Sequence, residues 1–179
     1  MVKKNTNTKT KDVAETKPTP TPTPIPKKVE IPRDYEIPVR SNVVGKLVYV
    51  TKDVNREWDN FGDIEYMTLA QLTTLRNTNR KYFENNWICV EDCDYTADEI
   101  YKALSVDKYY EVMKLYGSIE GIFNMPITQM KKVVPTLSKG LKENVVALIK
   151  EAYKNGDKRL DSRSAIKAFE EMFNIKLEG

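Results

Sequence analysis

The densest group of potential metal ligands is the acidic stretch 91–99, Glu-Asp-Cys-Asp-Tyr-Thr-Ala-Asp-Glu. Its oxygen-bearing residues have the one-three-five-seven spacing of a calcium loop, with Asp92, Asp94, Thr96 and Asp98 in those positions. Such a loop also needs glycine at its sixth position and a bidentate glutamate at its twelfth. Ala97 and Ala103 stand there instead, so we expect no calcium site. We assign Asp98 and Glu99 to the start of a helix, where negative charge is favoured.

A second oxygen-rich stretch spans residues 53–63. Its members are Asp53, Asn55, Glu57, Asp59 and Asp63. Paired carboxylates can perform acid–base chemistry. Val54, Trp58 and Phe61 are interleaved with them, however, and this pattern is typical of an extended segment with one buried face. We therefore interpret these acids as solvent-facing or turn residues and not as catalytic groups.

Other common sites lack essential residues. The chain has no histidine, which excludes Ser–His and Cys–His pairs and leaves Cys89 and Cys93 too few for a usual zinc site. Ser138-Lys139-Gly140 can hold a phosphate at a helix start, but no glycine-rich loop accompanies it. We expect Cys89, in an apolar run, to lie in the core and Cys93 to be a free thiol. The sequence thus predicts a protein that is not an enzyme and binds no cofactor or metal.

Basic residues form the main candidate binding surface. Segment 131–167 has ten basic and four acidic residues, whereas segment 84–120 has three basic and nine acidic residues. The candidate contacts for a partner protein or for nucleic-acid phosphates are Lys131, Lys132, Lys139, Lys142, Lys150, Lys154, Lys158, Arg159 and Arg163.

Three interpretations of this charge asymmetry stay open. The two segments can be solvated helix surfaces, complementary faces of neighbouring copies, or, for the basic one, a nucleic-acid surface. A helix, turn and helix over 141–173 has the length of a DNA-reading unit. The body, residues 31–179, is nearly neutral, with 22 basic and 23 acidic residues, which is unusual for a DNA-binding domain.

Residues 31–94 are expected to form a small α+β unit of ββαβ type. Val43–Thr51 is the clearest strand, because it is rich in β-branched and aromatic residues. Arg56–Phe61 and Trp87–Val90 are further strands, and we expect their tryptophans to share the core. The lead-in 29–39 contains two prolines, which predict an extended segment or an edge strand. Thr68-Leu-Ala-Gln71 is a capping box that begins a helix.

Residues 95–179 are expected to form a cluster of short helices. Thr96-Ala-Asp-Glu99 is a second capping box, Asp107 is a candidate cap for the next helix, and Asp161 or Ser162 for the last. The clearest amphipathic stripe consists of Leu141, Val145, Leu148, Ile149, Ala152 and Tyr153. Gly156 is a natural stop for that helix. The predicted fold class is therefore α+β.

The first thirty residues have a different composition from the rest. They contain seven lysines, three acids and the alternating run Pro18-Thr-Pro-Thr-Pro-Thr-Pro-Ile-Pro26. Such a segment buries too little apolar surface to fold, and its prolines favour an extended backbone. We expect residues 1–30 to be a disordered basic arm. They lack the apolar region of a secretory signal, and the chain has no apolar run long enough to span a membrane.

Several stretches between residues 41 and 92 match a family pattern. They are Gly45–Tyr49, Glu57-Trp58, Phe61–Asp63, Met67–Asn77 and Lys81–Ile88. With these stretches the chain resembles small proteins of tailed phages and prophages of low-GC Gram-positive bacteria. The resemblance implies a structural component of the virion or of its assembly, located in the virion or the host cytoplasm. Its partners would be other proteins of the assembly, including copies of itself, with nucleic acid as the alternative and no membrane.

Deletion of residues 1–28 should leave the thermal unfolding midpoint nearly unchanged, because the arm contributes almost no apolar surface to a core. Thermal unfolding followed by circular dichroism checks this prediction. A large loss of stability in the shortened protein would show that the arm packs on the body.

Overall fold

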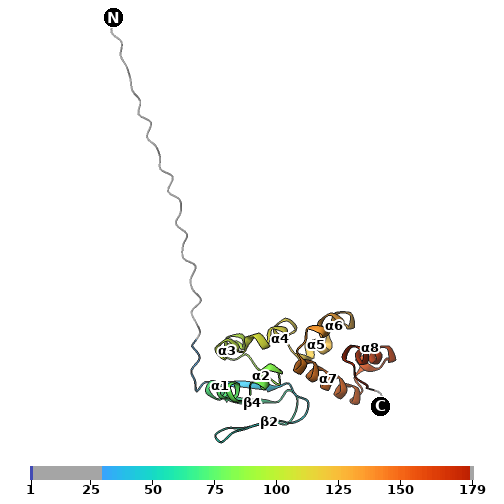
Figure 1. The fold of residues 1–179 in the computed structure, drawn as a ribbon, viewed down its shortest axis with the longest axis horizontal. Helices are drawn as coiled ribbons and strands as arrows, with labels where there is room; N and C mark the ends of the chain where they lie inside the picture. Colours follow the sequence, from blue (N-terminus) through green and yellow to red (C-terminus); the bar gives the residue numbers. More distant parts are fainter. Residues whose placement is uncertain (2–29, 178–179) are drawn as a thin grey trace.

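The computed structural model describes Met1 and residues 30–177. It has the predicted α+β class, with a small antiparallel sheet at one end of the body and a group of short helices at the other (Figure 1). The predicted disordered arm lies outside the described residues.

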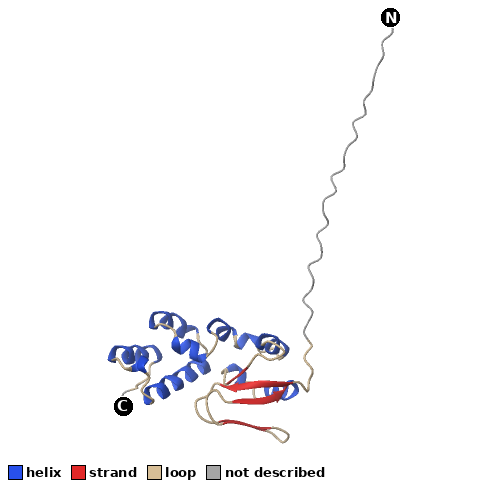
Figure 2. Ribbon diagram, turned by 180° about the vertical axis from the view of Figure 1, so that it is seen from behind, coloured by secondary structure: helices blue, strands red, loops and turns tan. Residues whose placement is uncertain are grey.

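Five strands form two antiparallel sheets. The three-stranded sheet has the order β4-β1-β5, made of β4 (Ile64–Thr68), β1 (Glu36–Ser41) and β5 (Ile88–Val90). The hairpin of β2 (Leu47–Val50) and β3 (Asn55–Trp58) forms a separate two-stranded sheet beside it (Figure 2). The expected strands are therefore present, but Val43–Lys46 precedes the first of them as a loop.

The lead-in segment is more structured than its prolines predicted, because β1 is the central strand of the sheet. The amide of Glu91 donates to the carbonyl of Pro38 over 3.0 Å. The N–H and C=O groups of one residue in an antiparallel strand point toward the same neighbouring strand. The nitrogen of Pro38 therefore points toward the β5 side of the sheet, at a position just beyond the end of β5 at Val90. The missing N–H therefore removes no bond within a paired stretch. The edge-strand prediction was wrong for this reason.

A capping box marks the start of the first helix. The Thr68 hydroxyl accepts from the Gln71 amide, and the Gln71 side chain accepts from the Thr68 amide, which confirms the first capping box. This box starts α1 (Leu69–Thr78), and α2 (Lys81–Glu84) follows after a short break.

Every regular element that the structure describes between residues 97 and 173 is a helix. The helices of this second half are α3 (Ala97–Ala103), α4 (Glu111–Tyr116), α5 (Ile119–Asn124), α6 (Ile127–Val133), α7 (Lys139–Lys154) and α8 (Arg163–Phe173). Three 3₁₀ turns separate them: η1 (Asp107–Tyr109), η2 (Val134–Thr136) and η3 (Lys158–Leu160).

Side-chain caps start most of the longer helices in this half. The capping box of Thr96 and Glu99 is confirmed, and Ser162 caps α8 as one of the two predicted candidates. Asp107 was predicted to cap a helix, but it lies within η1 and makes no capping bond. The prediction failed because the chain makes a 3₁₀ turn there before α4 begins.

One hydrophobic core connects both halves, from Ile31 to Phe169. Trp58 is completely buried, and its indole donates to the Val39 carbonyl over 2.9 Å. Trp87 is only half-buried and packs edge-on against Tyr82, so it lies at the margin of the core and not at its centre. Cys89 is buried and Cys93 is an exposed free thiol, as predicted.

Buried asparagines join the sheet to α7. The side-chain amides of Asn42 and Asn144 both donate to the carbonyl of Asn86, each over 3.1 Å. Asn144 also donates to the carbonyl of Asn85, and the side chain of Asn86 donates to the carbonyl of Tyr109. Three segments far apart in the sequence therefore meet at the turn between α2 and β5.

A glycine allows α7 to approach this turn. A Cβ atom on Gly140 would lie 2.4 Å from the Cα atom of Asn85, which is too close for any side chain. Asn86 has a φ of 53°, a left-handed conformation that asparagine adopts more readily than most residues. Gly140, predicted as part of a weak phosphate motif, thus has a packing role.

Replacing Asn144 with Ala should lower the free energy of unfolding by about 1–3 kcal/mol, because buried carbonyls lose a donor and no water replaces it. Asn155, an exposed residue just after the same helix, supplies the matched control Asn155→Ala, which should change stability little. Denaturant unfolding measures both. Equal effects of the two substitutions would contradict a structural role for the buried amide.

Candidate docking groove

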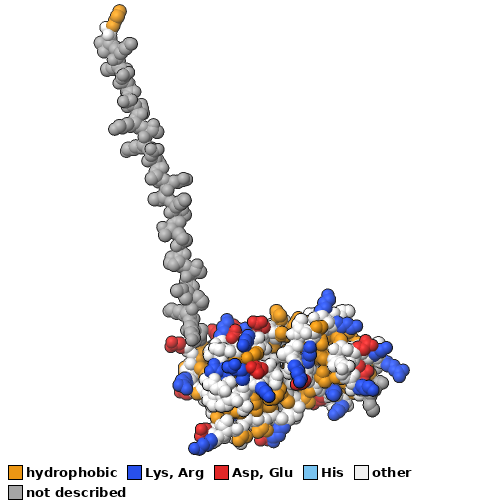
Figure 3. Space-filling model, in the orientation of Figure 1, with side chains coloured by type: hydrophobic (Ala, Val, Ile, Leu, Met, Phe, Trp, Pro, Cys, Tyr) orange, Lys and Arg blue, Asp and Glu red, His pale blue; other side chains and the backbone are white. Residues whose placement is uncertain are grey.

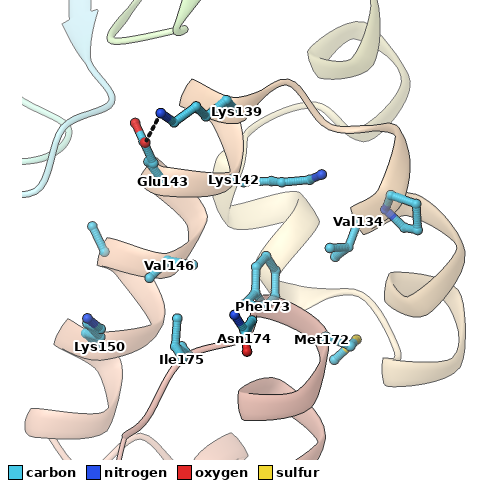
Figure 4. Close-up of a pocket in the computed structure, with 12 residues that line it drawn as sticks. Val134, Lys139, Lys142, Glu143, Val146, Lys150, Met172, Phe173, Asn174 and Ile175 are labelled. Atoms are coloured by element: carbon cyan, nitrogen blue, oxygen red, sulfur yellow. Dashed lines mark ion pairs between the residues drawn. The ribbon is translucent and has the colours of Figure 1, made fainter.

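A groove of about 790 Å³ lies between α7 and the C-terminal end of α8. Apolar side chains form much of its surface, and three lysines of α7 stand around it (Figure 4). Its lining residues are Val134, Pro135, Lys139, Lys142, Glu143, Val146, Ala147, Lys150, Met172, Phe173, Asn174 and Ile175.

The two faces of α7 explain one wall of the groove. Leu141, Val145 and Ile149 are buried against the body, as the predicted apolar stripe requires. Residues three or four apart share a helix face, so Lys139, Lys142, Val146 and Lys150 fall together on another side. That side faces the groove.

The opposite wall is made by the end of α8 and the segment that follows it. Asn174 has a φ of 51° and ends α8 in a left-handed conformation. The chain then folds back on α8, where the amide of Ile175 donates to the carbonyl of Glu170 and the amide of Leu177 to its carboxylate. Phe173 and Ile175 therefore lie across from Val146 of α7 (Figure 4).

A smaller hollow of about 360 Å³ extends the groove along α7. It is lined by Lys150, Tyr153, Lys154, Lys176 and Leu177. Lys150 borders both hollows, so the two lie next to each other along the helix, and together we call them the trough. Five lysines and one glutamate are found among the described lining residues, and the glutamate, Glu143, is 3.9 Å from Lys139.

Four of the nine predicted basic residues line the trough, and five do not. Lys139, Lys142, Lys150 and Lys154 line the trough. Lys131 and Lys132 are exposed on α6, and Lys158 and Arg163 are exposed near the start of α8, all outside the lining residues. In Figure 3, Lys and Arg side chains project around the helical end of the body, with hydrophobic atoms between them.

Neither the apolar wall nor Lys176 was predicted from the sequence. Met172 and Phe173 of the last helix are only half-buried and line the groove. The signal available in the sequence was the row of Lys139, Lys142, Val146 and Lys150 on α7, which lies outside the buried stripe.

Arg159 is engaged within the protein. Its guanidinium forms two bonds to the Asp157 carboxylate, of 2.9 and 2.5 Å, and lies 3.8 Å above the ring of Phe123. Bonds from the Arg159 side chain and its backbone amide lower the pKa of Asp157 to about 2. Arg159 is therefore engaged with Asp157 and Phe123 within the protein, and its contact with a partner stays a prediction.

The acidic segment 84–120 is also used internally. Glu91 and Glu120 pair with Arg40, and Asp98 pairs with Lys102 and Lys114. Four further acids accept hydrogen bonds. The hydroxyls of Tyr109 and Tyr35 donate to Glu84 and Asp94, respectively. The backbone amides of Ala97 and Thr96 donate to Asp92 and Glu99, respectively. Seven of its nine acids thus have partners within the chain.

The described residues contain no group of three or more His, Cys, Asp or Glu side chains placed to hold a metal ion. The buried thiol of Cys89 is unsuited to nucleophilic attack, because burial raises its pKa and favours the neutral form. None of the helices in residues 30–177 is both long and apolar enough to cross a membrane.

Comparison of the chain with protein-family models, with curated proteins and with solved structures found no match.

The carboxyl of Asp157 should titrate near pH 2 in the native protein, and Arg159→Gln should return its pKa toward the ordinary value of 3.8. Because the native pKa is depressed, the stabilisation is present above about pH 4 and is lost as the pH falls toward 2. Carboxyl NMR shifts followed against pH measure both values. An Asp157 pKa near 3.8 in the parent protein would show that Arg159 is free to bind partners.

Proposed function

We propose that this protein is a non-enzymatic docking component of a multi-protein assembly, and that the assembly is a tailed-phage particle or its precursor in the host cytoplasm. The observation that supports the docking role best is the apolar, lysine-bordered trough along α7.

The trough has the composition of a recognition site. Val146, Met172, Phe173 and Ile175 are half-buried and line it. Contiguous exposed apolar surface bordered by polar residues marks an interaction site in many proteins. The proposal therefore assigns this trough to a partner that covers its apolar wall.

The body can hold a docked partner in a defined position. One core connects both halves, and the asparagine junction fixes α7 to the sheet. Near the start of the body, the carbonyls of Arg33 and Tyr35 accept from the amides of Ala70 and Leu69 in the first turn of α1. α1 and α8 lie at opposite ends of the body, so the trough is far from this start (Figure 1).

The phage setting is supported by the likeness of residues 41–92 to small phage proteins. Those residues include the two outer strands of the main sheet, the hairpin, α1 and α2, and they contain the turn at Asn86 that bonds to α7. Residues 41–92 contact α7 through this turn, but none of them lines the trough.

Nucleic-acid binding is the second candidate function. It is favoured by Lys131, Lys132, Lys158 and Arg163, which are exposed and form no ion pair within residues 30–177. Binding through these residues would weaken steeply as the salt concentration rises, because each phosphate contact releases a counterion. A random-sequence duplex titrated at two salt concentrations separates this function from docking to protein.

Val146→Glu should reduce association of the protein with phage particles at least about tenfold, since a charge on the apolar wall costs more than 1.4 kcal/mol of binding. Gln129→Glu is the matched control, because Gln129 is exposed on α6 outside the trough and gains the same charge. The measurement is the amount of each protein that sediments with intact particles from a phage-producing culture of the source bacterium. Absence of the parent protein from particles and their precursors, or equal sedimentation of both variants, would overturn the proposal.

A further inference from the structure

We propose that the trough along α7 receives an acidic amphipathic helix from a different protein. This inference rests on the proposed docking function and specifies the chemistry of the partner. The trough follows α7, which has 16 residues and is therefore about 24 Å long at the usual rise per residue. An apolar stripe on a partner helix of similar length would cover Val146, Phe173 and Ile175.

The lysines around the trough determine which sign of charge the partner must carry. Lys139 and Lys142 stand at one end of the trough, and Lys150, Lys154 and Lys176 at the other. Lys142, Lys150, Lys154 and Lys176 form no ion pair with any residue that the structure describes. Carboxylates that flank the apolar stripe of the partner would meet these ammonium groups, whereas a basic partner would be repelled.

A helix suits the trough better than an extended strand does. One long wall is α7, whose backbone groups are already bonded within that helix. The opposite wall is the last turn of α8 and the segment 174–177, which is not a strand, so neither described wall offers a strand edge to a partner strand. Recognition of a helix in a groove instead uses apolar anchors three or four residues apart. The spacing of Lys139, Lys142, Val146 and Lys150 on α7 has the same period.

The chain itself offers no suitable occupant. Residues 1–30 carry seven lysines against three acids, which is the wrong sign for this trough. The acidic segment of a second copy is also unsuitable, because seven of its nine acids already bond within their own chain. The geometry therefore favours a different protein over head-to-tail assembly of this one.

Nucleic acid and lipid fit the trough less well. Its apolar wall is mainly aliphatic, with Phe173 and Tyr153 as the described aromatic side chains that line the two hollows. Single-stranded nucleic acid prefers successive aromatic platforms, and a membrane surface is contacted by a protruding amphipathic face, not by a concave one. Both ligands remain as outcomes of the test.

The test uses the full chain and three synthetic 16-residue helical peptides that share one leucine stripe. Their flanking positions are all glutamate, all glutamine or all lysine. Fluorescence anisotropy should give the order glutamate, glutamine, lysine, with at least about tenfold between the first and the last. Affinity for the glutamate peptide should fall as salt rises, because salt screens the lysine–carboxylate attraction.

Two double variants link this preference to the trough. Lys142→Glu with Lys150→Glu should abolish the preference for the glutamate peptide over the lysine peptide, because three lysines and three glutamates would then line the trough. Unchanged circular dichroism shows that this variant is folded. Lys131→Glu with Lys132→Glu makes the same change of charge on α6, outside the trough, and should leave the order intact. If the two double variants had equal effects, the peptide preference would depend only on the net charge of the protein, and the inference would be overturned.

Three other results would also overturn it: no preference among the peptides, tighter binding of a DNA oligonucleotide that displaces the glutamate peptide, or tighter binding of phosphatidylglycerol vesicles that displace it. The particle experiment separates this failure from failure of the proposed function. If Val146→Glu loses particle association while the peptides show no preference, the docking function stands and the acidic helix is the wrong partner. If Val146→Glu keeps particle association, the docking function itself fails.

Discussion

The carbonyl of Asn86 is the constraint on which the arrangement of this protein depends. It accepts side-chain amides from Asn42, just after the central strand, and from Asn144 on α7. Buried polar groups of this kind are costly unless every partner is in place, so they favour one arrangement of the two halves over near alternatives. The close approach of Gly140 to Asn85 makes the same contact sterically specific.

This junction also explains why the trough exists. Once Asn144 and its apolar neighbours are fixed against the body, the side of α7 with Lys142, Val146 and Lys150 must face outward. The end of α8 covers that side only in part, because Asn174 turns the chain back along α8. An apolar wall and a row of lysines are therefore left accessible by the same packing that stabilises the core.

The two charged segments have different physical roles. Among the acids of 84–120, Glu91, Glu120 and Asp98 pair with cations of the chain, and four others accept hydrogen bonds from neutral hydroxyl or amide groups. Most lysines of 131–167 lack such partners within the described residues, and Arg159 is an exception. A near-neutral body thus presents a positive trough.

The sequence by itself determined the features that depend on neighbours in the chain. The capping boxes of Thr68 and Thr96, the cap at Ser162, the α+β class and the burial of Trp58 and Cys89 follow from residues within a few positions of one another. Only the tertiary structure decided that β1 is central, that Trp87 is marginal and that Asn42, Asn86 and Asn144 meet. It also decided which lysines share a surface with Phe173 and Ile175. Local hydrogen bonds follow from the spacing of residues in the chain. The two bonds to Asn86 span 44 and 58 positions and depend on how whole elements pack, which no local pattern predicts.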